Sequence, residues 1–398
     1  MRVAIVGGGI VGVTAALTLA EGDAEVVVFE AGIVAGEASG LNAGVVGGGG
    51  WGDRPDIDVA LKMGSRERFI DLVERRGHDI GLDRTGTLTV IRTDRELAWA
   101  EATAAAERAA GRAIELLDQA ELQRLEPELD PDLLGALLDP LAVRAEPVAT
   151  TEAFAAEAGL AGADIRTGCV VTGMRPAAAG GWDLTVDGSD AVGADALVLA
   201  AGPWCGQLGR LIGVDIPIVA VRGQMWASPA PPRVLRHALA AAESATDWGE
   251  PSAQTTPPFL THVGGRRLTR HLYGRQRLNG ELVFGGDRVQ VGQPTDDRSV
   301  DADGIDVNRR HVAELLPRVA DHPIARTWSG FMPFSLDGRP LIGPVAGVDG
   351  LFVAGGLASS GFGRGPMTGR LVADLVLGRD PGVDVGAVLP GDRIRPTD

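Results

Sequence analysis

The sequence predicts an α/β fold at its amino terminus and an α+β organisation over the whole chain. The apolar run Val3–Val6 suits a buried parallel strand, an alanine-rich helix is expected over residues 11–20, and a second strand over 24–29. Strands and helices that alternate in this way are typical of a parallel sheet covered by helices. From residue 216 onward the strand pattern becomes antiparallel.

The turn between the first strand and the first helix has the spacing of a dinucleotide-binding loop. Gly7, Gly9 and Gly12 fit the pattern G-x-G-x-x-G. Glycine here allows a sharp turn, a close approach of backbone N–H groups to a pyrophosphate, and tight packing of helix on strand. The amino terminus of the helix then faces the phosphate charge. Glu30, at the end of the second strand, can accept hydrogen bonds from a ribose diol, which a simple glycine-rich turn does not explain.

The composition argues against several classes of protein. A chain of 398 residues is long enough for two domains, and a formal net charge of −16 argues against nucleic-acid binding. Two cysteines, Cys169 and Cys205, imply neither a disulfide framework nor a cysteine-based metal site, and we expect no metal. We recognise no signal peptide and no uncharged apolar run of membrane-spanning length, so we expect a cytoplasmic protein without an integral membrane segment.

Residues 37–50 are too rich in small side chains for an ordinary helix. A backbone with so few side chains suits a flat ligand lying against it, and Ser39 and Asn42 can donate hydrogen bonds to that ligand. A flexible glycine loop is the alternative.

The remaining elements are expected in chain order. Helices are expected over 58–76, 95–110, 118–125 and 150–162, a hairpin over 81–92, a strand pair within 164–175, and strands over 182–186, 196–200, 218–225, 268–274 and 281–286. Residues 228–258 are rich in proline and have little hydrophobic period, so we expect a lid or a surface excursion there.

The last third of the chain contains a second glycine-rich loop before a helix. A strand over 351–354 leads into the glycines of 355–365, and a helix is expected over 367–377 with Gly378 as its C-cap. The positive end of this helix dipole favours an anion at the loop. The N1/C2=O edge of a reduced flavin is such an anion.

Several motifs together resemble one enzyme family. They are the amino-terminal fingerprint, Ala38–Gly44, Ala200–Trp204, Val221–Gln224, Asp337–Pro340 and Pro366–Gly369. In this order they resemble the FAD-dependent amine oxidoreductases of the D-amino-acid oxidase (DAO) family, which includes glycine oxidase, sarcosine oxidase and D-amino-acid dehydrogenases. The resemblance spans nearly the whole chain.

The resemblance implies two domains and a reaction. A Rossmann-like FAD-binding domain is expected from 1–82, 144–214 and 331–383, a substrate-binding domain with a large mixed or antiparallel sheet from 83–143 and 215–330, and a tail from 384–398. The implied reaction is oxidation of a C–N bond in an amine, imino acid or amino acid, by hydride transfer to flavin N5 and hydrolysis of the imine. Oxygen or another electron acceptor then reoxidises the flavin.

The resemblance also implies which residues contact FAD, with Val171 contacting adenine through its backbone. The expected set is Gly7, Gly9, Ile10, Val11, Gly12, Glu30, Ala31, Ser39, Asn42, Ala43, Gly44, Val171, Ala201, Gly202, Trp204, Gly330, Ser360, Gly361, Phe362 and Gly363.

Met332 departs from the family pattern, in which an arginine usually binds the substrate carboxylate at this position. Losing a charged partner for a buried carboxylate costs on the order of 1.5–3 kcal/mol. Either another arginine takes this role, with Arg222 and Arg364 as candidates, or the substrate has no carboxylate there. A flavin-edge or surface ion pair is the alternative role for both arginines.

By the same alignment His271 replaces an active-site tyrosine of the family. In a strand, His271 would share one face with Tyr273 and Arg275. The residues expected on the substrate side of the flavin are His271, Tyr273, Met332, Ser360 and Arg364. For the histidine, the tyrosine and the methionine, a packing role within the sheet is the alternative.

The FAD is expected to be bound without a covalent link. No cysteine follows Cys205, and the first histidine, His78, lies beyond the loop where amino-terminal attachment occurs in the family. The lysine that sarcosine oxidases of this family place over the flavin has no obvious counterpart here, because Lys62 is the only lysine, and this favours a dehydrogenase over an oxidase.

Other flavoprotein classes fit less well. A flavin hydroxylase would carry a Gly-Asp motif where this chain has Val353–Gly356, and a disulfide reductase would need two neighbouring redox cysteines. A flavin-dependent 2-hydroxy-acid oxidoreductase and a flavoprotein subunit that needs a partner for electron transfer stay open, as does the oligomeric state.

Overall fold

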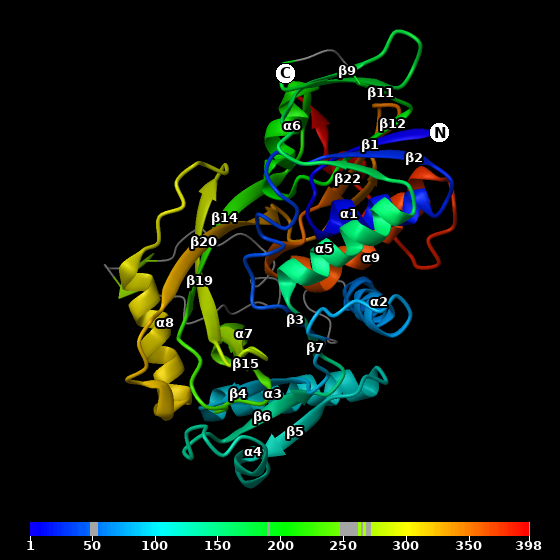
Figure 1. The fold of residues 1–398 in the computed structure, drawn as a ribbon. Coiled ribbons are helices and arrows are strands. Elements are labelled where there is room, and N and C mark those ends of the chain that lie inside the picture. The colour runs from blue at the N-terminus through cyan, green and yellow to red at the C-terminus, as the bar shows by residue number, and fades with distance from the viewer. Residues whose placement is uncertain (48–54, 189–191, 247–261, 264–265, 268–271, 398) are drawn as a thin grey trace.

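The computed structural model describes residues 1–47, 55–188, 192–246, 262–263, 266–267 and 272–397. Two large sheets, each assembled from segments far apart in the chain, form its framework (Figure 1). The mixed α/β architecture that we expected is therefore confirmed.

The first sheet has six strands in the order β21–β22–β12–β1–β2–β8. Strands β22, β12, β1, β2 and β8 run parallel, and β21 is an antiparallel edge strand. The bounds are β1 (Arg2–Val6), β2 (Glu25–Phe29), β8 (Asp164–Arg166), β12 (Ala196–Leu199), β21 (Leu341–Pro344) and β22 (Leu351–Gly355).

Both faces of this sheet are covered, which explains the continuous apolar runs of its strands. Val3 and Ile5 pack in one core with helices α1 (Ile10–Ala20), α5 (Pro147–Leu160) and α9 (Gly361–Val376), which lie side by side in Figure 1. Helix α2 (Pro55–Glu74) packs against α9. Ala4 and Val6 face the other core, which includes the small sheet of β9 (Val171–Pro176), β10 (Trp182–Val186) and β11 (Val192–Ala194) and helix α6 (Cys205–Leu211).

The second sheet has eight strands in the order β20–β14–β19–β18–β15–β4–β6–β5. Strands β15 and β4 pair in parallel and the other neighbours are antiparallel, so the sheet is mixed. The bounds are β4 (Thr87–Ile91), β5 (Glu115–Asp118), β6 (Gly135–Asp139), β14 (Ile218–Ala227), β15 (Ala238–Ala241), β18 (Tyr273–Gln276), β19 (Leu282–Gly292) and β20 (Arg326–Ser335).

Helices pack along this second sheet at two places. Helix α8 (Ala302–Leu315) lies against β14 and β19, where Trp226 donates to the side chain of Asn308 at 2.8 Å. Helices α3 (Asp94–Ala109) and α4 (Gln119–Leu125) pack near β5 and β6, and α7 (Glu243–Thr246) lies against α3 (Figure 1). The short pairs β3 (Val45–Val46) with β7 (Val143–Arg144), β13 (Val214–Asp215) with β23 (Arg395–Pro396), and β16 (His262–Val263) with β17 (Arg266–Arg267) complete the strands.

Four expected elements were wrong in detail. Residues 81–92 contain one strand, β4 (Thr87–Ile91), whose partners are β6 and β15, and they form no hairpin. The strands within 164–175 do not pair with each other, because β8 joins β2 and β9 joins β10. Within the expected surface excursion, 238–241 is strand β15 of the large sheet, while 247–261 lie outside the described residues. Helix α9 begins at Gly361, before the expected position, and includes Pro366.

The structure also shows where the proposed domain limits fall on the strands. Strand β20 belongs to the large sheet along its whole length, Arg326–Ser335, and so continues past residue 331. In the tail, Val388 and Ile394 are buried, and β23 pairs with β13.

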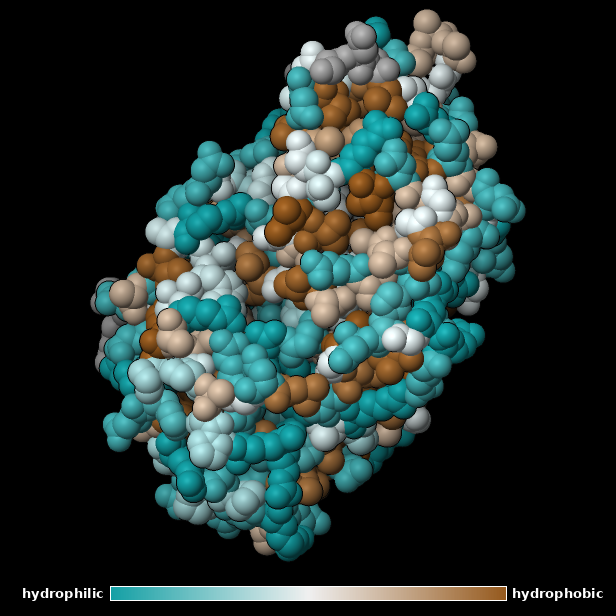
Figure 2. Space-filling model, viewed as in Figure 1, coloured by the Kyte–Doolittle hydropathy of each residue, from teal (hydrophilic) through white to brown (hydrophobic). Residues whose placement is uncertain are grey.

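The surface seen in Figure 2 shows apolar residues gathered mainly in the upper half of the view, whereas the lower lobe around β5 and α4 is mostly hydrophilic. Among the residues that the structure describes, none of the helices combines the length and the apolar character that crossing a membrane requires.

Contact between α1 and α9 depends on glycine. A Cβ at Gly369 would lie 2.1 Å from Thr14 Oγ1 and 2.5 Å from the Val11 carbonyl oxygen. The backbones of the two helices therefore approach more closely than any side chain at this position allows.

We expect Gly369→Val to push α9 away from α1 and to lower the free energy of unfolding by about 1–3 kcal/mol, the usual cost of overpacking. Scanning calorimetry would show this as a lower melting temperature. Gly159→Ala in α5 is the matched control, because no atom lies within 4 Å of a Cβ there. Equal melting temperatures for both variants would contradict this role of Gly369.

Candidate active site

A cavity of about 1520 Å³ lies between the two sheets. Residues at the carboxyl ends of the parallel strands line one side of it, among them Val6, Phe29 and Gly355, and residues of β14, β18, β19 and β20 line the other. Ligand pockets usually measure about 300–1,000 Å³. The cavity therefore has room for a long cofactor together with a small substrate.

The fingerprint turn is shaped by contacts that exclude side chains. Gly7 has a φ of 114°, and a Cβ there would lie 2.6 Å from the Ala200 carbonyl oxygen. A Cβ at Gly12 would lie 1.9 Å from the Gly7 carbonyl oxygen. Both glycines are thus required by the packing of β1, β12 and α1, as the spacing predicted.

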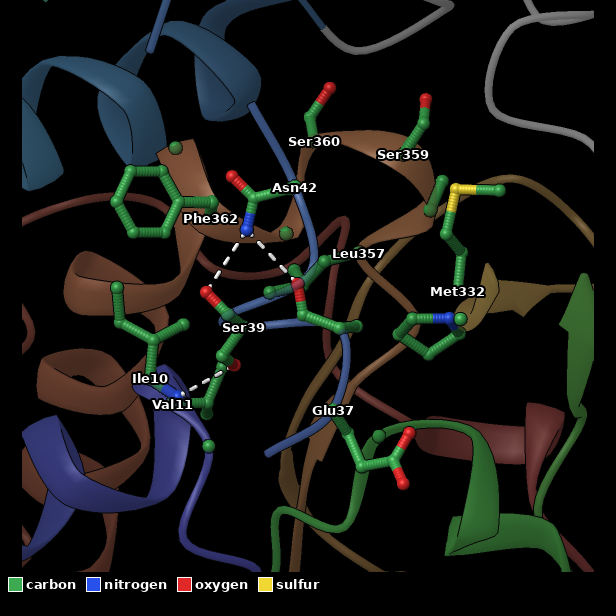
Figure 3. Close-up of a pocket in the computed structure, with 18 of the residues that line it drawn as sticks. Ile10, Val11, Glu37, Ser39, Asn42, Met332, Leu357, Ser359, Ser360 and Phe362 are labelled. Atoms are coloured by element: carbon green, nitrogen blue, oxygen red, sulfur yellow. Dashed lines mark hydrogen bonds between the residues drawn. The ribbon is translucent and has the colours of Figure 1, made fainter. Parts of the chain in front are cut away.

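Ser39 reaches the amino terminus of α1 from the glycine-rich loop. Its Oγ accepts a hydrogen bond from the Ile10 N–H at 3.0 Å (Figure 3) and occupies the space beside Gly9, where a Cβ would lie 2.9 Å from that oxygen. Since α1 has no acidic residue in its first turn and no side-chain cap from its own N-cap residue, its amino terminus can accept an anion.

Glu30 holds the turn from the end of β2. Its carboxylate accepts hydrogen bonds from the N–H groups of Gly8 and Gly32, each at 2.7 Å. Carboxylate oxygens have further lone pairs, so Glu30 can also accept a hydrogen bond from a hydroxyl group of a ligand in the cavity.

Asn42 shapes the loop after Ser39. Its Nδ2 donates to the carbonyl oxygens of Ala38 and Ser39, both at 3.0 Å (Figure 3). Its Oδ1 accepts from the Gly44 N–H at 2.7 Å. The amide hydrogens that we expected to reach a flat ligand are therefore engaged within the loop.

The second glycine-rich loop approaches the first from β22. Gly361, Phe362 and Gly363, at the amino terminus of α9, line the cavity, and Ser360 and Phe362 lie near Asn42 in Figure 3. Ala358 has a φ of 53°, a strained conformation for a residue with a side chain. Two helix amino termini, those of α1 and α9, thus border one cavity.

The wall opposite these loops carries Met332 and Tyr273. Met332 lies on β20 and its Cε would be 2.9 Å from a Cβ at Gly223, so its thioether lies over the neighbouring strand. The Tyr273 hydroxyl lies 3.4 Å from the Met225 sulfur, and burial raises the pKa of Tyr273 to about 12. The phenol is therefore neutral near pH 7 and can donate a hydrogen bond.

Comparison with known proteins identifies the family. The model of the DAO family, described as FAD dependent oxidoreductase, matches residues 2–375. The chain belongs to this family.

Individual relatives match over nearly the full length. Glycine oxidase of Geobacillus kaustophilus is 29% identical over 96% of this chain and 94% of its own, and glycine oxidase of Pseudomonas putida is 28% identical over 99% of both. The crystal structure of the Geobacillus kaustophilus enzyme superposes with a TM-score of 0.84 at 28% identity, covering 98% of each chain. This protein is therefore an FAD-dependent oxidoreductase.

Most of the residues expected at the FAD line the cavity. They are Gly7, Gly9, Ile10, Val11, Glu30, Ala31, Ser39, Asn42, Val171, Ala201, Gly202, Trp204, Gly330, Ser360, Gly361, Phe362 and Gly363. Gly12, Ala43 and Gly44 lie behind this surface. The glycine turn, the loop of small residues and the two helix amino termini border one cavity of about 1520 Å³, and this combination fits a dinucleotide that carries a flavin.

The residues expected at the substrate are distributed differently. Tyr273, Met332 and Ser360 line the cavity, whereas His271 lies outside the described residues. Arg364 lies behind the second glycine loop: it is 2% exposed, pairs with Asp58 at 2.5 Å and donates to the Leu357 carbonyl oxygen at 3.3 Å. The structure thus gives Arg364 an internal ion pair in place of the expected substrate contact.

Arg222 is half-buried on β14 and does not line the cavity.

Three basic residues that line or support the site were not predicted, namely Lys62, Arg275 and Arg288. Lys62 lines the cavity and pairs with Asp58 at 2.9 Å, one helical turn earlier, and burial lowers its pKa. The i, i+4 spacing of an acid and a base in α2 was the available sequence signal for Lys62.

Arg275 connects the large sheet to the glycine-rich loop of residues 37–47. It is 2% exposed; its Nε donates to the Ala43 carbonyl oxygen at 2.5 Å, and Nη2 donates to the Ala145 carbonyl oxygen and to Glu146, both at 2.9 Å. Gly44, with a φ of 75°, passes so close to Ala145 that a Cβ would lie 1.9 Å from its carbonyl oxygen. Arg275 therefore positions the backbone of the glycine-rich loop at the cavity.

We expect Arg275→Met to weaken FAD binding about tenfold or more, because a charged hydrogen bond of roughly 1.5–3 kcal/mol to the loop is lost. Equilibrium titration of the apoprotein with FAD, followed by flavin fluorescence, measures this. Arg277→Met is the control, since Arg277 pairs with Glu146 and Glu281 but does not reach Ala43. Similar FAD affinities for the two variants would contradict the positioning role.

Proposed function

We propose that this protein oxidises a C–N bond in a small amine, imino acid or amino acid. The observation that supports it best is the arrangement of one cavity: the loops that fit FAD form one side, and a wall with Met332 and Tyr273 forms the other. A small substrate between them would have its reacting carbon beside the cofactor. The names of the relatives, glycine oxidases, agree with an amine substrate.

When bound, FAD supplies the redox chemistry by accepting a hydride at N5. The residues of the chain bind and orient the substrate and exclude water. The neighbouring apolar side chains Met332 and Leu357 suit this desolvating role, and both lie on the cavity wall (Figure 3). Tyr273, with its pKa raised to about 12 by burial, suits a hydrogen-bond donor better than a general base.

Anaerobic mixing with a panel of small amines, imino acids and D-amino acids tests this proposal. We expect at least one compound to bleach the oxidised flavin band, and the matched 2-hydroxy acids to leave it unchanged. Bleaching by hydroxy acids alone would instead favour a flavin-dependent 2-hydroxy-acid oxidoreductase. The absence of bleaching by every compound would favour a subunit that needs a partner chain.

The electron acceptor is tested in the same cuvette. Readmitting air after bleaching restores the oxidised band within seconds if oxygen is the acceptor, whereas slow recovery indicates a dehydrogenase with another acceptor.

The proposed function includes a cytoplasmic location for the protein.

We further expect the FAD to be released by acid. Precipitation with trichloroacetic acid should leave the yellow colour in the supernatant, because the chain has no cysteine beyond Cys205 and no histidine before His78 for a covalent link. Colour that stays in the pellet would contradict non-covalent binding. Mass spectrometry of the denatured chain provides an independent measurement.

A further inference from the structure

Arg288 lies on the cavity wall, on the strand two places from Met332. It belongs to β19 and is paired across the sheet with Gly223 of β14, which is paired in turn with Gly330 of β20. The residue is 2% exposed and lines the cavity. A long, charged side chain is thus buried where a substrate would lie.

Met332 and Leu41 lie over the glycine backbone of the strands beside Arg288. Gly223 and Gly330 have no side chains, and positions above them are taken by Met332, whose Cε would lie 2.9 Å from a Cβ at Gly223, and by Leu41, whose Cδ1 would lie 3.0 Å from a Cβ at Gly330. A small ligand that touches Arg288 would therefore also touch the thioether of Met332.

The surroundings of Arg288 favour an anion beside it. Its guanidinium lies 5.8 Å from the centre of the Phe334 ring, which is fully buried. Burial lowers the pKa of Arg288 to about 9, while charge interactions with Tyr273 and Asp287 act in the opposite direction. A carboxylate in the cavity would likewise raise the pKa of Arg288, because a nearby negative charge stabilises the charged guanidinium.

The other basic side chains among the described lining residues are committed elsewhere. Lys62, on α2, pairs with Asp58, and Arg112, beyond the end of α3, forms two hydrogen bonds with Glu107 at 2.5 and 2.8 Å. Arg288 differs from both because it lies in the large sheet, on β19, whose neighbour β18 carries Tyr273 and which only β14 separates from β20, the strand of Met332.

We propose that Arg288 binds the carboxylate of the substrate, so that the ligand is a small amino or imino acid with its apolar part against Met332. The planar guanidinium can form a bidentate pair with a carboxylate. This assignment rests on the proposed function for the amine, but the carboxylate site itself can be tested without turnover.

Binding of propionate to the oxidised holoenzyme tests the site directly. We expect propionate, but not the neutral propionamide, to perturb the flavin absorption spectrum of the wild type at saturating concentration. Arg288→Met should weaken propionate binding by about 10- to 150-fold, the range for a hydrogen bond to a charged group. Arg288→Lys should give an intermediate affinity, because it keeps the charge and loses the bidentate geometry.

Arg222→Met is the matched control, since Arg222 precedes Gly223 on β14 and does not line the cavity. The Arg222→Met variant should bind propionate within about twofold of the wild type, because its Arg288 side chain is unchanged and can form the same hydrogen bonds with the carboxylate. FAD content and melting temperature show whether each variant is folded. Equal affinity of the Arg288→Met and wild-type proteins, or a wild type that propionate does not perturb, would overturn the proposal.

Turnover then separates this inference from the proposed function. For the pairs D-alanine and ethylamine, glycine and methylamine, and proline and pyrrolidine, Arg288→Met should lower kcat/KM about 10- to 150-fold for the acid and change it little for the amine. Equal losses within each pair would overturn the role of Arg288. If the wild type oxidises none of them, the proposed function fails, while the propionate titration still decides the carboxylate site.

Discussion

The structure depends on direct backbone contact at a few glycines. Gly12 must lie against Gly7, Gly7 against Ala200, and Gly369 against the first turns of α1, each at distances where a Cβ would overlap. These contacts bring α1 and α9 side by side, with their amino termini at one cavity. Because the partial positive charges of helix amino termini act only within the first turn, this proximity decides where a cofactor with anionic groups can bind.

The large sheet does more than cover the cofactor site. Arg275 donates to Ala43 and the Trp328 indole donates to the Leu41 carbonyl oxygen at 3.0 Å, so two of its strands hold the glycine-rich loop of residues 37–47. Buried donors that reach backbone carbonyl groups are costly to leave unsatisfied. The loop and the sheet are therefore coupled, and the geometry of the cofactor and that of the substrate wall depend on the same hydrogen bonds.

Charge is distributed unevenly inside the site. Arg364 and Lys62 share Asp58, with Arg364 behind the second glycine loop and Lys62 at the cavity lining, whereas Arg288 faces the cavity with an aromatic ring beside it. A buried ion pair mainly maintains the packing around it, while a buried cation at a cavity wall can contribute to recognition of an anion. The two arginines have the same exposure, 2%, and only their surroundings distinguish them.

The sequence by itself determined the cofactor side of this protein. The glycine spacing, Ser39, Glu30 and the loop before α9 act through local backbone geometry, and local geometry follows from neighbouring residues. It also determined that Met332 provides no charge for a substrate. Only the tertiary structure decided that Arg364 is internal, that 238–241 joins the large sheet, and that Arg288 faces the cavity. These depend on the register between strands such as β14 and β19, which are more than fifty residues apart, and residue spacing along one strand does not encode that register.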